Sequence, residues 1–294
     1  MSQFKNKNVV VTGASRGIGL SISKRLAKEG ANIAILAKTD VPHPKLNGTI
    51  FTAAKDIEEF GVKVLPIKTD IRFDDQVETA IEKVNYEFGS IDILVNNASA
   101  INLFNTETLS MKRFDLMQDI NVRGTYLCSK TCLPFLKKSS NPHILNLSPP
   151  INLKPKWFEN FTAYTLSKYA MSMNVLGMSR EYKKYNIAVN ALWTKTAINT
   201  AAISMLGGFV SPEQCRKPEI GLLIEAEQQI GVNLRGVFFI GDKESDVIAA
   251  LDFECVPLLV KTGYGSKTLE SENLPKYIKV FRNLSDAVDY VLSL

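Results

Sequence analysis

The sequence predicts an α/β protein with a doubly wound parallel sheet and an α/β extension at its C-terminal end. Short apolar segments rich in β-branched residues alternate with longer amphipathic stretches of helical periodicity. Strands that are apolar along their whole length are typical of parallel sheets, because helices cover both faces. We expect six such strands, at residues 8–12, 32–36, 62–67, 92–96, 143–148 and 187–193.

The composition is that of a globular protein and argues against several classes of partner. The chain has 294 residues, of which 45% are hydrophobic and 22% charged, and its net charge is +5. This basic excess is mild and contains no cluster longer than Lys183-Lys184, so we expect no nucleic-acid partner. No apolar run approaches the roughly 20 residues that a bilayer requires, and the N-terminus is polar. We therefore expect a cytoplasmic protein with no membrane span.

The cysteines and histidines do not form a metal-binding pattern. None of the four cysteines makes a CxxC pair, and His43 and His143 stand far apart, so we expect no structural zinc site. Cys128 and Cys132 fall at helical spacing on an apolar face and are predicted to be buried free thiols.

A glycine-rich turn, TGASRGIG at residues 12–19, follows the first strand and opens a helix. Gly13 permits a tight turn, Gly17 lets the backbone approach a pyrophosphate, and Gly19 lets helix and strand pack closely. Such a turn can be purely structural, but the strand–turn–helix context favours a dinucleotide site. The residues expected to bind the cofactor here are Gly13, Ser15, Arg16, Gly17, Ile18 and Gly19.

The end of the second strand indicates which dinucleotide binds. NAD sites usually place an acid there to hold the ribose 2′-hydroxyl, whereas this chain has Lys38 and no acid until Asp40. Lys38 and Arg16 offer two cations to a 2′-phosphate, although Lys38 can also be an ordinary solvated lysine. The sequence favours NADP as cofactor over NAD.

A tyrosine and a lysine lie four residues apart at Tyr164 and Lys168, which places both on one helix face. The lysine cation is expected to favour the phenolate and lower the pKa of Tyr164. Tyr164 would then pass a proton to a carbonyl oxygen while the nicotinamide delivers hydride, and Lys168 would also hold the ribose hydroxyls. Such a pair is common on helices, and it indicates a catalytic site only in a chain that also has a dinucleotide-binding motif.

Together TGASRGIG, NNAS at 96–99 and YTLSK at 164–168 resemble the short-chain dehydrogenase/reductase family. The segments TDVPHPKLNGTIFTAA, HILNLSPP and NALWTKTAI look like its branch called hydroxysteroid dehydrogenase-like protein 2, a resemblance that covers about residues 5–220. It implies a Rossmann fold, hydride transfer to or from a small-molecule carbonyl or alcohol, and a homo-oligomer. It also implies site roles for Ser148 as the catalytic serine, Asn121 in a proton relay, Asp70 at the adenine amine and Asn97 beside the cofactor.

The chain departs from the family pattern near the expected serine. In that family the catalytic serine is commonly the second of a Ser-Ser pair that ends the fifth strand, but here Ser148 is followed by Pro149, so the second serine is replaced by proline. Either the bend at the prolines re-aims Ser148, or no serine participates. Thr194 likewise replaces a proline that often follows the sixth strand. Four aromatic residues can form a wall for a bulky or lipid-like substrate or can simply be core: Trp157, Phe158, Phe161 and Trp193.

From Cys215 onward the chain resembles a different family. CRKPEIGLLIEAEQQIGV and FFIGDKESDVIAALDFECVPLLVKTGYG are similar to the later half of heptose-bisphosphate and histidinol-phosphate phosphatases, of the haloacid dehalogenase-like superfamily. Lys217 matches their phosphate-binding lysine, and Asp242 and Asp246 match the acids that hold magnesium. The Asp-x-Asp nucleophile of that superfamily occurs nowhere in the sequence, so we expect vestigial metal ligands, no bound magnesium and no phosphatase activity.

We therefore expect a Rossmann domain over residues 1–214 and a partial haloacid dehalogenase-like segment over 215–294. The helix in IGLLIEAEQQIG and the strand in GVFFIGD can together complete the Rossmann sheet, and the residues after about 243 are then expected to form an added module. If Asp242 and Asp246 are solvated, their replacement by asparagine should change stability little. The leading function is an NADP-dependent oxidoreductase. The alternatives are a catalytically impaired NADP-binding scaffold and, ranked last, a sugar-phosphate phosphatase.

Overall fold

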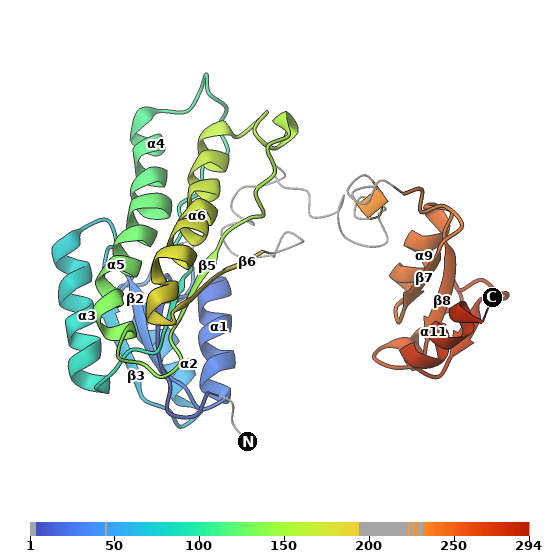
Figure 1. Ribbon diagram of the computed structural model, residues 1–294, viewed down its shortest axis with the longest axis horizontal. Helices are drawn as coiled ribbons and strands as arrows, with labels where there is room; N and C mark the ends of the chain where they lie inside the picture. The colour runs from blue at the N-terminus through green and yellow to red at the C-terminus, as the bar shows by residue number, and fades with distance from the viewer. Residues whose placement is uncertain (1–3, 45, 194–222, 224–225, 228–231, 294) are drawn as a thin grey trace. The chain divides into compact units, whose positions relative to one another are not determined.

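The computed structural model describes residues 4–44, 46–193, 223, 226–227 and 232–293. The chain divides into two compact units: the first comprises residues 1–195 with 200–205, and the second residues 206–294 with 196–199. Figure 1 shows the first unit in blue to yellow and the second in orange to red. The expected boundary at residues 214–215 lies outside the described residues.

The first unit contains a six-stranded parallel sheet in the order β3-β2-β1-β4-β5-β6. All six predicted strands are confirmed, with ends that differ by at most two residues. They are β1 (Asn8–Thr12), β2 (Asn32–Ala37), β3 (Val64–Lys68), β4 (Ile93–Asn96), β5 (His143–Leu147) and β6 (Ala188–Leu192).

Helices cover both faces of this sheet. Successive side chains of a strand point to opposite faces, so neighbouring residues pack against different layers of helices. In β1, Val9 and Val11 pack in one apolar cluster and Val10 in the other. The helices α1 (Gly17–Lys28) and α2 (Ile50–Glu58) contribute to the first cluster. The second cluster takes side chains from α3 (Asp74–Phe88), α5 (Thr125–Leu136) and α6 (Thr162–Glu181). The shorter elements are α4 (Met111–Met117), η1 (Gln118–Gly124), η2 (Pro155–Trp157) and η3 (Tyr182–Tyr185).

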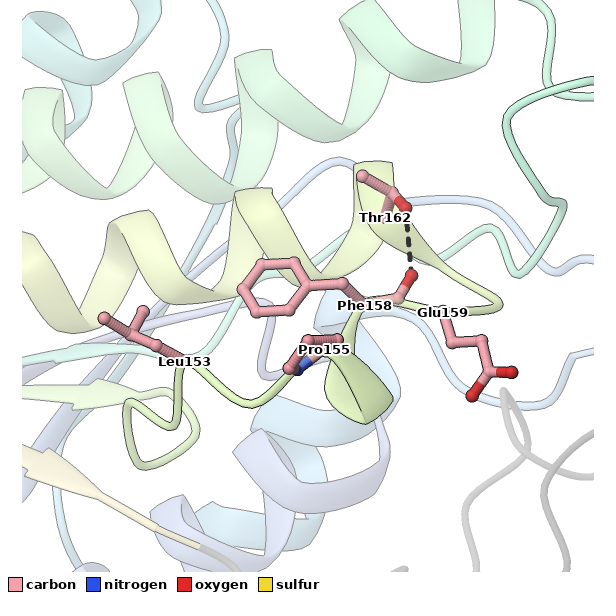
Figure 2. Close-up of a pocket in the computed structure, with 5 residues that line it drawn as sticks. All are labelled: Leu153, Pro155, Phe158, Glu159 and Thr162. Atoms are coloured by element: carbon pink, nitrogen blue, oxygen red, sulfur yellow. Dashed lines mark hydrogen bonds between the residues drawn. The ribbon is translucent and has the colours of Figure 1, made fainter.

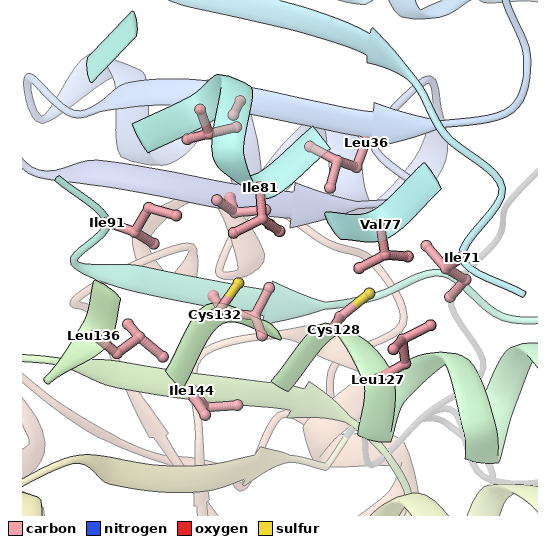
Figure 3. Packing of buried hydrophobic residues seen from close by; sticks show 14 of the residues in the cluster. Leu36, Ile71, Val77, Ile81, Ile91, Leu127, Cys128, Cys132, Leu136 and Ile144 are labelled. Atoms are coloured by element: carbon pink, nitrogen blue, oxygen red, sulfur yellow. The ribbon is translucent and has the colours of Figure 1, made fainter. Parts of the chain in front are cut away.

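Figure 3 shows the second cluster, which contains Cys128 and Cys132 of α5 together with Ile81 of α3 and Ile144 of β5. Both cysteines are fully buried, which confirms the prediction of buried free thiols. Burial raises the pKa of Cys128 to about 12, so its thiol is not a nucleophile at neutral pH.

The direction of the strand order reverses between β1 and β4. From β1 the chain moves outward to β2 and β3, and then returns to the other side of β1 through α3. In open parallel sheets a ligand binds beyond the carboxyl ends of the strands at this reversal. The fold therefore places the glycine turn after β1 and the segment after β4 at the expected site.

The second unit has its own three-stranded parallel sheet, in the order β7-β8-β9. Its strands are β7 (Phe238–Gly241), β8 (Val256–Val260) and β9 (Lys279–Phe281), and its helices are α9 (Glu244–Asp252), α10 (Gly265–Thr268) and α11 (Leu284–Leu292). Phe239 packs against a cluster that contains Ala250 and Phe253, whereas the ring of Phe238 lies 6.2 Å from that of Tyr290 in α11.

The expectation that GVFFIGD completes the first sheet is wrong, because β7 pairs with β8 in the second sheet. The crossover between these two strands consists of α9 and a few flanking residues. Closing so short a connection costs less chain entropy than pairing with a strand far away in sequence.

Across the described part of the chain, no helix combines the length and apolarity needed to cross a bilayer.

Candidate functional site

The glycine turn after β1 is packed too tightly for side chains at two positions. Gly13 has φ +68°, and a Cβ added there would lie 2.7 Å from Cα of Ala98. A Cβ on Gly19 would lie 2.4 Å from Nδ2 of Asn97 and 2.8 Å from the carbonyl oxygen of Gly13. These close approaches are those expected of a tight turn and of close helix–strand packing.

Asn97 ties the glycine turn to the end of β4. Its Nδ2 donates to the carbonyl oxygens of Thr12 (2.9 Å) and Gly13 (3.0 Å). In return, Thr12 Oγ1 accepts from the backbone nitrogens of Asn97 and Ala98, both at 3.0 Å. The side chain of Asn97 is thus occupied in shaping the site, and its place beside a cofactor stays a prediction.

The first turn of α1 is open to an anion. Its N-cap residue, Arg16, makes no side-chain capping bond, and the turn contains no acidic residue. Backbone N–H groups at a helix start lack partners within the helix and carry partial positive charge. Residues 13–19 therefore fit the pyrophosphate of a dinucleotide.

Arg16 and Lys38, the two expected 2′-phosphate ligands, have different surroundings. Arg16 donates from Nε to the carbonyl oxygen of Asn47 (2.9 Å) and from Nη2 to that of Gly48 (2.5 Å), and burial lowers its pKa. The side chain of Lys38 is exposed just after β2. Asp40, the nearest acid along the chain, pairs with Lys68 at 2.9 Å. In this arrangement Lys38 is the more accessible cation.

Asp70 lies beyond the end of β3 and is held by Arg72. Arg72 donates to both carboxylate oxygens, with Nη2 2.6 Å from Oδ2 and Nε 3.0 Å from Oδ1. Burial alone would raise the pKa of Asp70, but the hydrogen bonds from Arg72 hold it below its ordinary value. Asp70 is therefore a carboxylate at neutral pH, and its contact with adenine stays a prediction.

Asn121 is fully buried in the π-helical turn η1, and both the oxygen and the nitrogen of its side-chain amide form hydrogen bonds. Oδ1 accepts from Ser99 Oγ (3.0 Å) and the nitrogen of Ala100 (2.7 Å). Nδ2 donates to the Ala100 carbonyl oxygen and to Ser167 Oγ, both at 2.9 Å. Asn121 thus joins the segment after β4 to α6. Single π-helical turns inside helices are frequent at functional sites.

Tyr164 and Lys168 lie one turn apart on α6, but the expected effect of the lysine on the phenol is absent. Burial raises the pKa of Tyr164 to about 12 and lowers that of Lys168 to about 8. Lys168 Nζ donates to the carbonyl oxygen of Leu147 at 2.8 Å and lies 3.2 Å from Sδ of Met171. The expectation that Lys168 lowers the pKa of Tyr164 is wrong for this geometry, because its ammonium is directed at the end of β5.

Burial of Lys168 predicts a pH-dependent stability cost. Between pH 8 and its ordinary pKa of 10.5, an unfolded lysine binds a proton that the folded one does not, so stability rises with pH in this window. Lys168→Met should therefore raise the melting temperature at pH 7, and the gain should vanish above about pH 10.5. Melting curves of both proteins from pH 6 to 11 measure this, with the exposed Lys183→Met as control. A gain that does not change with pH contradicts the prediction.

Ser148 follows the last residue of β5 and is only 5% exposed. Its hydroxyl has no hydrogen-bond partner within the described residues. A buried polar group without a partner is rare and costs free energy, which is typical of a group that serves a ligand. The hydroxyl is enclosed by protein atoms in this conformation, and the catalytic role of Ser148 stays a prediction.

The segment between β5 and α6 forms an open pocket of about 620 Å³. Figure 2 shows its lining, with Leu153, Pro155 and Phe158 on the segment that precedes α6 and Thr162 Oγ1 donating to the Phe158 carbonyl oxygen at 2.9 Å. Trp157 and Trp193 are 42% and 54% exposed, so neither belongs to the core. Phe158 and Phe161 are half-buried.

Asp242 and Asp246, the expected vestigial metal ligands of the second unit, bind backbone groups. Asp246 is buried, and its Oδ2 accepts from the nitrogens of Asp242 and Lys243, both at 3.1 Å. Asp242 Oδ2 accepts from the nitrogen of Tyr264 at 2.8 Å. Within the described residues no three His, Cys, Asp or Glu side chains gather as a metal site, and Lys217 lies outside those residues.

The condition that both acids be solvated fails for Asp246, which holds the start of α9. Asp246→Ala should lower the stability of the second unit by about 1–2 kcal/mol, since two backbone N–H groups lose their acceptor. Asp252→Ala, an exposed acid of the same helix, should change it by less than about 0.5 kcal/mol. Urea denaturation followed by circular dichroism checks this, and equal effects of the two replacements would refute the capping role.

Two serines belong to the site although the sequence did not predict it. Ser99 and Ser167 both bond to Asn121, yet they stand far from it along the chain. No local spacing signal marks such contacts, because helix and strand periods relate only near neighbours.

The reversal in strand order, the glycine turn beside it and the tyrosine–lysine pair on α6 define a dinucleotide-binding oxidoreductase of the Rossmann type. Residues 7–205 match the short chain dehydrogenase family, and the chain belongs to that family.

Relatives of the hydroxysteroid dehydrogenase-like branch are similar over the same region. The hydroxysteroid dehydrogenase-like protein 2 of Xenopus laevis is 61% identical over 210 residues, which are 71% of this chain and 50% of the relative. The human protein of that name is 60% identical over 212 residues, 72% of this chain and 50% of the relative. The chain thus spans about half the length of these curated relatives.

Solved structures agree on the fold. A dehydrogenase from Xanthomonas campestris has 50% identity and a TM-score of 0.69, covering 74% of this chain and 80% of its own. An alcohol dehydrogenase from Thermococcus sibiricus, complexed with 5-hydroxy-NADP, has 27% identity and a TM-score of 0.56, covering 64% and 75%. An NAD⁺-bound xylitol dehydrogenase has 26% identity and a TM-score of 0.59, covering 67% and 73%. Proteins of this fold therefore bind nicotinamide cofactors of both kinds.

The C-terminal part matches a second family. Residues 214–287 match the HAD-hydrolase-like family, which confirms the resemblance to the haloacid dehalogenase-like superfamily.

Proposed function

We propose that the protein is an NADP(H)-dependent oxidoreductase that transfers hydride between the nicotinamide and a carbonyl or alcohol substrate. The observation that carries the proposal is the buried, unpartnered hydroxyl of Ser148, beside a helix that bears Tyr164 and Lys168. The test is oxidation of NADPH by the purified chain with a panel of aromatic and aliphatic ketones, aldehydes and quinones. Binding of NADPH without turnover of any carbonyl would instead favour the impaired scaffold.

Tyr164, Ser148 and Lys168 have different roles in the proposed carbonyl reduction. The bound reduced nicotinamide supplies the hydride. Tyr164, whose pKa burial raises to about 12, keeps its proton at neutral pH and can donate it to the carbonyl oxygen. Ser148 donates a hydrogen bond to the same oxygen, where negative charge develops. Lys168, with a pKa of about 8, is still mainly cationic at pH 7 and favours that charge.

Lys38 is the residue proposed to select NADP. NADPH should bind at least about tenfold more tightly than NADH, because a charge-assisted bond to the 2′-phosphate is worth roughly 1.5–3 kcal/mol. Lys38→Asp should remove or reverse this preference. Titrations that follow nicotinamide fluorescence measure both affinities.

Two controls separate this role from other effects of charge and structure. Lys83→Asp makes the same charge change at an exposed site of α3 and should leave the preference intact. Arg16→Gln should weaken NADPH and NADH alike, because Arg16 binds the carbonyl groups of Asn47 and Gly48. Equal affinity of the parent protein for both cofactors would remove the basis for NADP selection.

The pocket near Phe158 favours a bulky, partly apolar substrate. Its volume of about 620 Å³ is in the range of small-molecule sites, and Leu153, Pro155 and Phe158 supply apolar surface. Exposed Trp157 lies in the same segment.

We also propose that the chain forms a homo-oligomer through α5 and α6. Exposed apolar side chains recur on these helices, at Tyr126, Leu166, Met173 and Leu176. Surfaces of this kind on a soluble fold mark protein–protein contacts. A phosphatase function is not proposed for the second unit, since Asp242 and Asp246 bind backbone groups and the sequence lacks an Asp-x-Asp nucleophile.

A further inference from the structure

Three side chains of α6 hold the end of β5 and the segment that follows it. Lys168 Nζ donates to the carbonyl oxygen of Leu147 at 2.8 Å, and Ser172 Oγ donates to that of Pro149 at 2.6 Å. Tyr169 adds a third bond, from its hydroxyl to the carbonyl oxygen of Asn152 at 2.9 Å. The first two bonds go to the residues directly before and directly after Ser148.

The Ser-Pro-Pro sequence makes these bonds important. Pro149 and Pro150 have no backbone N–H, so this segment cannot be held by the donors that would extend a strand ladder. Donors to its carbonyl oxygens therefore contribute to its position. Ser172 is 3% exposed and supplies such a donor to Pro149.

The geometry also links Ser148 to Tyr164. Tyr164, Lys168 and Ser172 are spaced at i, i+4 and i+8 on α6 and therefore form one stripe along the helix. Two members of the stripe bind the carbonyl oxygens of the residues before and after Ser148, and the third is the proposed proton donor. The helix thus acts as one rigid frame for both hydroxyl groups.

We propose that Ser172 is a positioning residue that directs the Ser148 hydroxyl toward the carbonyl oxygen that Tyr164 protonates. The inference rests on the proposed oxidoreductase function and deepens it. Ser172 touches neither substrate nor cofactor and acts only through the carbonyl group of Pro149, the residue after Ser148. The bond from Ser172 takes over the orienting task that backbone donors cannot perform in a Ser-Pro-Pro sequence.

A double-mutant cycle separates positioning from simple stabilisation. Ser172→Ala, Ser148→Ala and the double variant are compared with the parent chain, using saturating NADPH and phenanthrenequinone as a bulky dicarbonyl probe. Ser172→Ala should lower kcat about tenfold with little change in KM or in NADPH affinity, since small misplacement of a reacting group is costly. In the Ser148→Ala background the same replacement should cost less than about twofold.

Matched variants and a second readout complete the test. Ser179→Ala removes an exposed hydroxyl from the same helix and should leave kcat unchanged, whereas Ser172→Thr keeps the donor and should restore part of the rate. An equal loss in both backgrounds, or no loss on Ser172→Ala, overturns the positioning role.

If the parent chain reduces neither this quinone nor any carbonyl of the panel, the proposed function fails, and hydrogen exchange then tests the positioning by itself. Ser172→Ala should speed exchange of the amides of Ile151 and Asn152 about tenfold, because the segment loses its anchor. Exchange equal to that of the parent overturns the inference.

Discussion

Replacing Tyr164 by phenylalanine should reduce carbonyl reduction by about 10²–10⁴-fold while leaving NADPH affinity within about twofold of the parent. The phenol is the proposed proton donor, and its pKa of about 12 keeps it in the acid form throughout the neutral range. Phenylalanine preserves the ring and its packing, so the loss should fall on kcat. Steady-state rates with NADPH and phenanthrenequinone, together with a fluorescence titration, measure the two quantities.

Tyr86→Phe provides the matched control, because Tyr86 is 86% exposed on α3 and lies outside the proposed site. The pH dependence adds a second check on the same residue. Alcohol oxidation needs the phenolate, so its rate should rise about tenfold per pH unit while pH remains below the pKa of Tyr164. A Tyr164→Phe enzyme with the full parental rate would show that the proton comes from another group.

Replacing Phe239 by alanine should destabilise the second unit by about 2–4 kcal/mol and leave the first unit unaffected. Phe239 packs against the cluster of Ala250, Phe253 and Cys255, beneath α9. The described part of the second unit has few buried side chains, so the loss of one large ring removes much of its apolar contact.

The tryptophans allow the two units to be followed separately in the intact chain. Both tryptophans, Trp157 and Trp193, lie in the first unit, so their fluorescence reports its unfolding alone. Hydrogen exchange of the β7 and β8 amides reports the second unit. Tyr277→Ala, at a 74% exposed site, is the control. Two results would contradict independent packing of Phe239. Phe239→Ala would lower the stability of the first unit, followed by tryptophan fluorescence, as much as that of the second, or it would lower the free energy of exchange of the β7 and β8 amides by less than about 1 kcal/mol.

Residues close together in sequence were sufficient to predict the first unit and the outline of its site. Uninterrupted apolar segments predicted all six strands, because a strand buried on both faces needs apolar side chains in both directions. The glycines of TGASRGIG predicted the tight turn, and the spacing of Tyr164 and Lys168 predicted a shared helix face. Each of these predictions depends only on the geometry of a single turn, helix or strand.

Contacts between residues distant in sequence decided the hydrogen-bond partners of the site residues and the sheet to which GVFFIGD belongs. Arg16 binds carbonyl oxygens 31 and 32 residues away, and Lys168 is directed at a carbonyl oxygen 21 residues away. Neither partner can be read from residue type, because every residue offers the same backbone carbonyl group. Similarly, GVFFIGD is apolar enough for either sheet, and only its pairing with β8 placed it in the second. The sequence by itself determined which local elements form, and the tertiary structure decided which polar group meets which, because a buried donor must bond to whatever acceptor the packing brings near.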